Sequence, residues 1–304
     1  MDGRPAPFFF SARRDMIGAS MTPGFHTDAF NSAYWSFGQC LDWGAAHGVA
    51  YIECGAVDGV SWIHGLGYQP HIALWEDPLK LRDEMERRGV RLSQLDAAFP
   101  LSRPEGATLG VEYILHAIRW AHLAGCACID TTDDRFPPAA MSETEAMAHM
   151  RRCYQQVVPA AERYGVVINI EPHGHFTTNP DRMEEMLAFV DSPALRMNFD
   201  SGNTFIAGQD PAAFLRRFLA KVSHVHIKDV SASLAAAARG ELTGIAVSHC
   251  AIGEGVNADN IRACLRLLKE QGYAGVLSLE CEGQGGPMLE RSLAWVRREL
   301  EALA

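Results

Sequence analysis

Short apolar runs with the pattern of buried strands alternate along the chain with longer amphipathic stretches that have the pattern of helices. The strand-like runs are rich in aliphatic residues, as is typical of parallel strands covered on both faces. They lie at Met16–Ser20, Ala50–Cys54, Arg91–Asp96, Cys126–Asp130, Val167–His175, Leu195–Asp200, Val222–His226 and Val276–Glu280. A helical stretch follows each run, so the sequence predicts eight consecutive strand–helix units.

Helix boundaries carry independent signals. Ser142 followed by Glu145 forms a capping box, Asn179-Pro180 starts a helix, and Gly89 ends one. Strand–helix repetition implies parallel strands joined by crossover helices, and eight such units close into a barrel. We therefore predict an α/β fold, a single (β/α)8 TIM barrel over residues 1–304, with an N-terminal extension at 1–15. Residues 230–255 form a predicted loop insertion at the C-terminal face, between strand 7 and helix 7.

The composition is that of a globular protein, with 48% hydrophobic and 21% charged residues. A net charge of −10 disfavours a nucleic acid or acidic membrane partner. No apolar run approaches the ~20 residues of a membrane span, and no signal-peptide pattern opens the chain. The eight cysteines are scattered without a metal-binding or disulfide spacing, so we expect reduced thiols and a cytoplasmic protein.

The last four strand-like runs each end in a group that can bind a metal. These groups are Glu171, Asp200, His226 and Glu280. In this fold the strand ends form the active site, and carboxylates that converge there repel one another unless a cation neutralises them. Three carboxylates and one imidazole suit Mn²⁺, Mg²⁺, Co²⁺ or Fe²⁺, and Zn²⁺ less well.

Five motifs, in order, resemble the xylose-isomerase-like barrel superfamily of sugar isomerases and epimerases. They are Ile170-Glu171-Pro172-His173, Asn198-Phe199-Asp200-Ser201-Gly202-Asn203, His224-Val225-His226-Ile227-Lys228-Asp229, Ile252-Gly253-Glu254-Gly255 and Leu277-Ser278-Leu279-Glu280. The resemblance implies one divalent cation, most often Mn²⁺, held by Glu171, Asp200, His226 and Glu280. It also implies a small carbohydrate substrate, with Glu171 and Glu280 as the catalytic acid/base pair that works through an enediolate.

Further residues near the strand ends are candidates for substrate binding. The set is His173, His175, Asn203, Lys228, His249, Glu53 and Asp96. His249 occupies the place of a metal-binding histidine in the DNA-repair endonuclease branch of the superfamily. However, Asn203 and Val247 stand where that branch has further metal ligands, which argues against endonuclease activity and for a contact between His249 and the substrate.

Three functional hypotheses remain open. The first is a metal-dependent isomerase or epimerase of a keto-sugar or inosose. The second is a lyase that uses the same site to dehydrate an inosose or to eliminate the aglycone from a 3-keto-glycoside, for which a small partner subunit is plausible. The third is a non-catalytic sugar-binding barrel. We expect a homo-oligomer. We expect no nucleotide cofactor, because no phosphate-binding glycine motif follows a strand.

Overall fold

The computed structural model describes residues 20–31, 33–58, 70–240, 243–244, 246–283 and 285–303. The predicted extension at 1–15 lies outside these residues. In the described part of the chain eight parallel strands close the barrel, with β1 paired to both β9 and β2. The barrel strands are β1 (Thr22–His26), β2 (Tyr51–Val57), β4 (Arg91–Pro100), β5 (Cys128–Thr132), β6 (Val167–Ile170), β7 (Leu195–Asp200), β8 (Val222–Ile227) and β9 (Val276–Leu279). The TIM barrel predicted from the sequence is confirmed.

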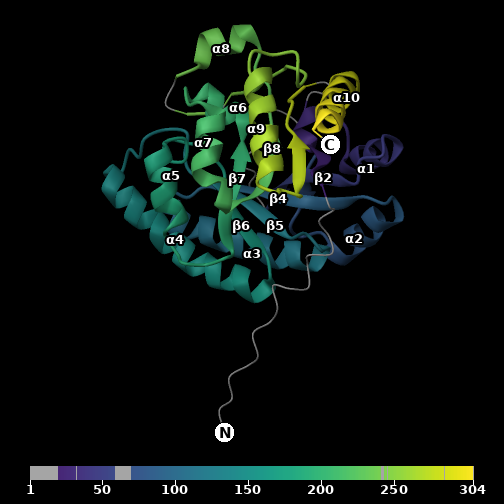
Figure 1. Ribbon diagram of the computed structural model, residues 1–304. Helices are drawn as coiled ribbons and strands as arrows, with labels where there is room; N and C mark the ends of the chain where they lie inside the picture. Colours follow the sequence, from purple (N-terminus) through teal and green to yellow (C-terminus); the bar gives the residue numbers. More distant parts are fainter. Residues whose placement is uncertain are drawn as a thin grey trace.

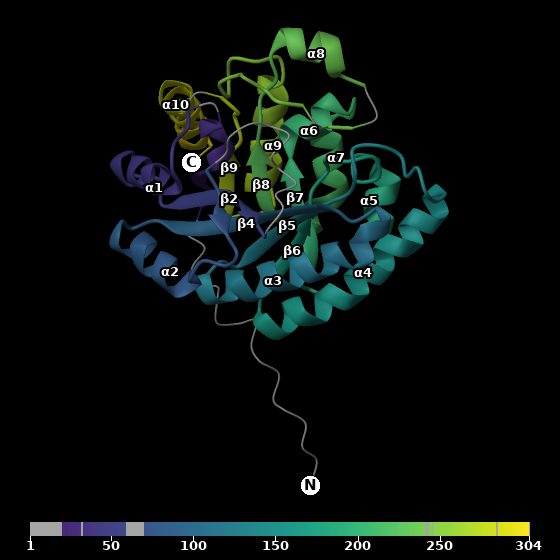
Figure 2. The ribbon, with the colours of Figure 1, turned by 180° about the vertical axis from the view of Figure 1, so that it is seen from behind.

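Helices surround the barrel, and α2, α3 and α4 lie side by side along one flank (Figures 1 and 2). The α-helices are α1 (Phe37–Ala46), α2 (Pro78–Arg87), α3 (Leu109–Ala124), α4 (Glu143–Tyr164), α5 (Pro180–Leu187), α6 (Ser201–Ile206), α7 (Pro211–Phe218), α8 (Ala232–Ala238), α9 (Ala258–Glu270) and α10 (Gly286–Ala302). Short additional elements are η2 (Thr27–Phe30), β3 (Ile72–Ala73), η4 (Pro104–Ala107) and η5 (Leu219–Lys221). No helix in the described ranges is both long and apolar enough to cross a membrane.

The helix signals in the sequence act as expected. The side chain of Ser142 accepts a hydrogen bond from the Glu145 N–H, and the Glu145 side chain accepts one from the Ser142 N–H. The Asn179 side chain caps α5 ahead of Pro180. Gly89 follows α2 with a φ of 68°, which an L-residue rarely adopts. Local sequence therefore sets where several of the outer helices begin and end.

The first strand was predicted in the wrong place. Ser20 lies outside any strand, Met16 to Ala19 lie outside the described residues, and β1 runs from Thr22 to His26. Pro23 and Gly24 weaken the strand signal there. Gly24 is needed because a Cβ atom would lie 2.8 Å from Val276 Cγ1 and 2.9 Å from the Tyr51 carbonyl oxygen. Close packing against the neighbouring strands, rather than local propensity, selects this segment.

The predicted insertion lies between β8 and α9 and contains α8, beyond the ends of β7 and β8 (Figure 1). The Asp229 carboxylate connects the beginning and the end of this insertion. It accepts hydrogen bonds from the backbone N–H groups of Val230, Gly253, Gly255 and Asn257, at 2.8 to 3.0 Å. This single buried side chain holds the insertion over the C-terminal face of the barrel.

Candidate metal centre

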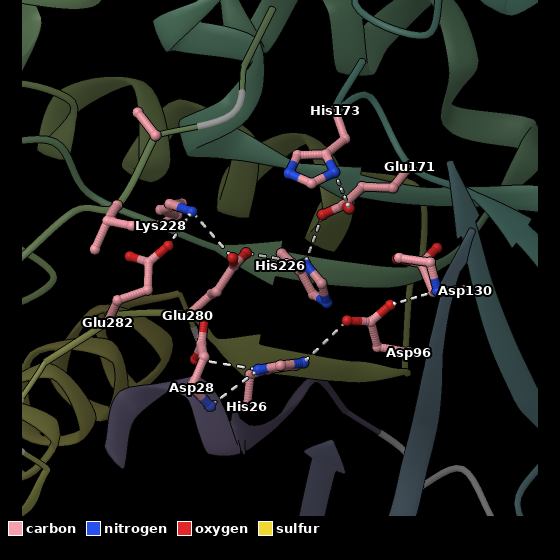
Figure 3. A pocket seen from close by; sticks show the side chains of 13 residues that line it. His26, Asp28, Asp96, Asp130, Glu171, His173, His226, Lys228, Glu280 and Glu282 are labelled. Atoms are coloured by element: carbon pink, nitrogen blue, oxygen red, sulfur yellow. Dashed lines mark hydrogen bonds and ion pairs between the residues drawn. The ribbon is translucent and has the colours of Figure 1, made fainter. Parts of the chain in front are cut away.

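A cavity at the C-terminal ends of the strands measures about 510 Å³, including its mouth. Its walls are mainly ionisable (Figure 3). Among the described residues, the carboxylates that line it are Asp28, Asp96, Asp130, Glu171, Glu280 and Glu282. The basic groups that line it are His26, His173, His226 and Lys228. Such walls suit a cation together with a polar ligand.

The imidazole of His226 lies among three carboxylates. Its Nδ1 is 2.9 Å from Glu171 Oε1, 3.1 Å from Glu280 Oε2 and 3.7 Å from Asp200 Oδ2. Strand register contributes to this arrangement, since Asp200 on β7 pairs with His226 on β8. Each of the four residues offers one ligand atom within 4.8 Å of the others. The structure thus brings together the four groups that the sequence singled out.

The two carboxylate oxygens of Asp200 differ in their hydrogen bonding. Its Oδ1 caps α6 by accepting the N–H groups of Gly202 at 2.6 Å and Asn203 at 2.8 Å. Its Oδ2 is buried and has no hydrogen-bond partner in the described part of the chain, and the same holds for Glu280 Oε2. Unsatisfied buried carboxylate oxygens are costly, and a divalent cation would satisfy both. The residues present therefore fit a metal.

Lys228 neutralises the other side of the same site. Its ammonium lies 2.9 Å from Glu280 Oε1 and 2.6 Å from Glu282 Oε1, and the side chain is buried. Asp28, Glu280 and Glu282 also offer closely spaced oxygens. Because the lysine already supplies a positive charge to two of these carboxylates, this second cluster does not require a metal ion.

The ionisable groups of the centre shift one another's pKa values. Burial favours neutral His226, but the carboxylates of Glu53, Asp200 and Glu171 raise the pKa of its imidazole well above the usual range. Burial and the charge of Glu280 raise the pKa of Asp200. Burial would also raise the pKa of Glu280, yet Lys228 and His226 lower it well below its usual value. In the metal-free protein a proton on His226 therefore supplies positive charge that a cation would replace.

A second imidazole, that of His26, forms part of the cavity wall. Its Nδ1 lies 3.1 Å from both the backbone nitrogen and Oδ1 of Asp28, and its Nε2 lies 3.9 Å from Asp96 Oδ2. Burial opposes protonation, but Asp28, Glu53 and Asp96 raise the pKa of His26 to about 10. Burial raises the pKa of Asp96 to about 7. The imidazole of His26 and the carboxyl group of Asp96 can therefore hold a proton near a bound ligand.

Four of the predicted substrate-binding residues lie at or beside the cavity. Lys228, Asp96 and His173 line it, and His173 Nδ1 is 3.8 Å from Glu171 Oε2. Asn203 is buried next to it and donates from Nδ2 to Glu171 Oε1 at 3.3 Å. These side chains can orient either the glutamate or a bound ligand.

The structure does not bring the other three to the cavity. His175 Nε2 pairs with Glu143 Oε1 at 2.9 Å, because the loop after His173 turns away from the barrel mouth. His249 Nδ1 lies 2.8 Å from the backbone oxygen of Glu282. Glu53 is fully buried beneath His226. In this structure His175 and His249 contact other parts of the protein and Glu53 contacts His226, so their contact with a substrate stays a prediction.

Sequence reasoning missed Asp28 and Glu282. Glu282 follows Glu280 by two positions, and the period-two alternation of an extended segment places both on one face, so this signal was present. Asp28 was missed because the first strand was placed at Met16–Ser20, whereas β1 ends at His26 and Asp28 follows it in η2. Both residues line the cavity and shape its charge.

Comparisons with known proteins agree with the fold. A family model described as xylose isomerase-like TIM barrel matches residues 41–301. An inosose dehydratase of Clostridium botulinum is 24% identical over 117 residues, which is 36% of this chain and 39% of that protein. A D-tagatose 3-epimerase-like protein of known structure superposes with a TM-score of 0.73 at 22% identity, over 93% of this chain and 98% of that one. A xylose isomerase domain protein from Planctomyces limnophilus gives a TM-score of 0.71 at 21% identity, with the same coverage.

Proposed function

Because the chain belongs to the xylose isomerase-like TIM barrel family, we propose that it is a divalent-metal-dependent isomerase or epimerase of a keto-sugar or inosose. One observation carries the proposal: Glu171, Asp200 and Glu280 converge on one nitrogen of His226, and among the described residues Asp200 Oδ2 and Glu280 Oε2 are buried without a hydrogen bond. The chain spans 39% of the length of the first curated relative and between 20% and 42% of the others, so the activity is a proposal.

Glu171, Asp200, His226 and Glu280 would hold the cation, and a mostly oxygen ligand set favours Mn²⁺, with Mg²⁺, Co²⁺, Fe²⁺ and Zn²⁺ as alternatives. When bound, the cation supplies positive charge next to the substrate carbonyl and its neighbouring hydroxyl, which stabilises an enediolate. Asn203 and His173 lie beside the Glu171 carboxylate and orient it. Lys228 forms an ion pair with Glu280 and holds its carboxylate at the cavity wall.

The two glutamates then move the proton. Glu171 directly follows β6 and Glu280 directly follows β9, and the two carboxylates lie on different sides of His226 (Figure 3). One carboxylate removes the proton from the carbon next to the carbonyl, and the other returns a proton to the opposite face. The configuration at that carbon is inverted, or the carbonyl moves to the neighbouring carbon.

The test of this proposal is exchange with solvent. Free ketohexoses such as D-allulose, and an inosose, are incubated with the Mn²⁺-loaded protein in D₂O. We expect the product to carry close to one deuterium per turnover at the carbon next to the carbonyl, because two carboxylates open to the cavity exchange their protons. Product without deuterium, or turnover that persists after removal of the cation with a chelator, would contradict the mechanism.

A second candidate is a lyase that eliminates water from an inosose, or the aglycone from a 3-keto-glycoside, after the same proton abstraction. The observation that favours it is His26, whose imidazole lies in the cavity wall beside Asp28 and can protonate a leaving oxygen. The partial match to inosose dehydratases points the same way. Release of water or aglycone from these substrates selects the lyase, whereas a new ketose selects the isomerase. A homo-oligomer, with a small partner subunit in the lyase case, remains part of this proposal.

A further inference from the structure

Glu53 lies in the barrel interior directly beneath the metal centre. It comes from β2, is fully buried, and its Oε2 is 2.8 Å from His226 Nε2. This is the ring nitrogen that faces away from Glu171, Asp200 and Glu280. Glu53 is not among the residues that line the cavity, so His226 stands between its carboxylate and the proposed cation site.

A directional chain of hydrogen bonds fixes the Glu53 carboxylate. The Ser223 hydroxyl donates to Asn169 Oδ1, the Asn169 amide donates to Gln94 Oε1 at 2.5 Å, and the Gln94 amide donates to Glu53 Oε1 at 2.8 Å. The chain runs from β8 through β6 and β4 to β2 across the barrel. Because each amide has one donor and one acceptor end, the donor direction is the same at every step. Glu53 ends the chain with Oε2 left to accept from His226.

Among the described residues, one other side chain competes for this nitrogen: Asn198 Nδ2 lies 3.1 Å from His226 Nε2. Its amide has another acceptor, Asp130 Oδ2 at 3.4 Å, and its Oδ1 faces His224 Nδ1 at 3.1 Å. A bare ring nitrogen could not stay 2.8 Å from the Glu53 oxygen, because two acceptors repel each other. The shorter contact places the proton on Nε2.

We propose that Glu53 is a positioning residue that keeps a proton on His226 Nε2 and thereby presents the Nδ1 lone pair to the cation. The inference rests on the metal centre proposed above. A carboxylate behind a ligand histidine fixes its tautomer and strengthens it as a ligand, and loss of such a partner weakens metal binding by about 10–100-fold. The same buried polar chain that fills the barrel interior thus sets the affinity of the centre.

Glu53→Gln tests the direction of the hydrogen bond at almost constant size. The Gln94 amide still needs an acceptor, so the new amide at position 53 turns its oxygen toward Gln94 and its NH₂ toward His226. That group can only donate, so Nε2 must accept and the ring proton moves to Nδ1, where it blocks the cation. We expect the Kd for Mn²⁺, measured by calorimetry on metal-stripped protein, to rise about 10–100-fold.

The double variant Glu53→Gln with Gln94→Glu is the matched control. The new carboxylate at position 94 accepts from Asn169 and from the amide at position 53, whose oxygen then accepts from His226 Nε2. The donor direction is restored although the charge has moved one residue away. We expect the Kd for Mn²⁺ to return to within about threefold of the original value. Unchanged binding in the single variant, or no recovery in the double variant, would overturn the proposal.

The tautomer can also be read directly at saturating Mg²⁺, a diamagnetic cation that displaces the second proton of the metal-free imidazole. Histidine-selective ¹⁵N NMR distinguishes protonated from bare ring nitrogens, and the signal of His226 among the 12 histidines is assigned from its loss in His226→Gln. We expect a proton on Nε2 in the original protein and in the double variant, and none in Glu53→Gln. Failure of the original protein to bind any divalent cation would remove the proposed function. A bare Nε2 in the original protein would overturn the role of Glu53 independently.

Discussion

Replacing Glu171 with glutamine is expected to lower kcat by about 10²–10⁴-fold, the range for loss of a positioned acid or base. The amide preserves the size of the side chain and can still accept the hydrogen bond from Asn203. It cannot take a proton from carbon, and it is a weaker ligand than a carboxylate. Steady-state kinetics at saturating Mn²⁺ separate the two effects, because excess metal compensates for weak binding but not for the missing base.

A matched control is available outside the cavity. Glu143 is half-exposed at the start of α4 and pairs with His175 outside the cavity. Glu143→Gln makes the same chemical change and should leave kcat within about twofold, since surface changes of this kind have small effects. If Glu171→Gln retains kcat within about threefold of the original protein at saturating metal, Glu171 is not the base.

Removal of the Lys228 charge is expected to cost about 3–5 kcal/mol of unfolding free energy, the range for breaking a buried ion pair. Lys228→Met keeps the length of the side chain but leaves Glu280 and Glu282 buried without their cation. Burial already raises the pKa of Glu282 to about 7, and without the lysine both carboxyl groups are expected to bind protons more tightly. Denaturant unfolding in the presence of a chelator measures the loss.

The pH dependence of this loss follows from its cause. A buried acid whose folded-state pKa is raised stabilises the protein at low pH and loses that contribution as pH rises through the folded-state pKa. The cost of Lys228→Met should therefore be larger at pH 8 than at pH 5. Lys221→Met, at an exposed lysine just before β8, should change stability by less than about 0.5 kcal/mol. A cost that is the same at both pH values would show that packing rather than charge is responsible.

The metal-capable residues were predictable because the fold itself orders them. In a parallel barrel every strand ends at the same face, so a carboxylate or imidazole directly after a buried apolar run must lie near the others. This rule needs only the strand ends of β6 to β9, and the sequence marks these clearly. It worked for Glu171, Asp200, His226 and Glu280.

Where the structure differs from what the sequence alone indicates, the reason is packing in three dimensions. The first strand is defined by a close approach at Gly24 rather than by β-propensity. A loop has no repeating pattern of hydrophobic and polar residues from which side-chain directions can be predicted. Nothing in the sequence therefore indicates that His175 turns toward Glu143. Glu53 illustrates depth within a strand: its residue type suggests a ligand contact, but its position below His226 makes it a partner of the histidine instead.

The central claim is that Glu171, Asp200, His226 and Glu280 form one cation site. It is tested most directly by calorimetric titration of the metal-stripped protein with Mn²⁺, alongside Asp200→Asn, which can still cap α6 through its oxygen. We expect one ion per chain, and an affinity in Asp200→Asn that is lower by at least about 10-fold, the smallest loss typical for a mere partner of a ligand. Absence of saturable binding in the original protein, or equal affinity in the two proteins, would contradict it.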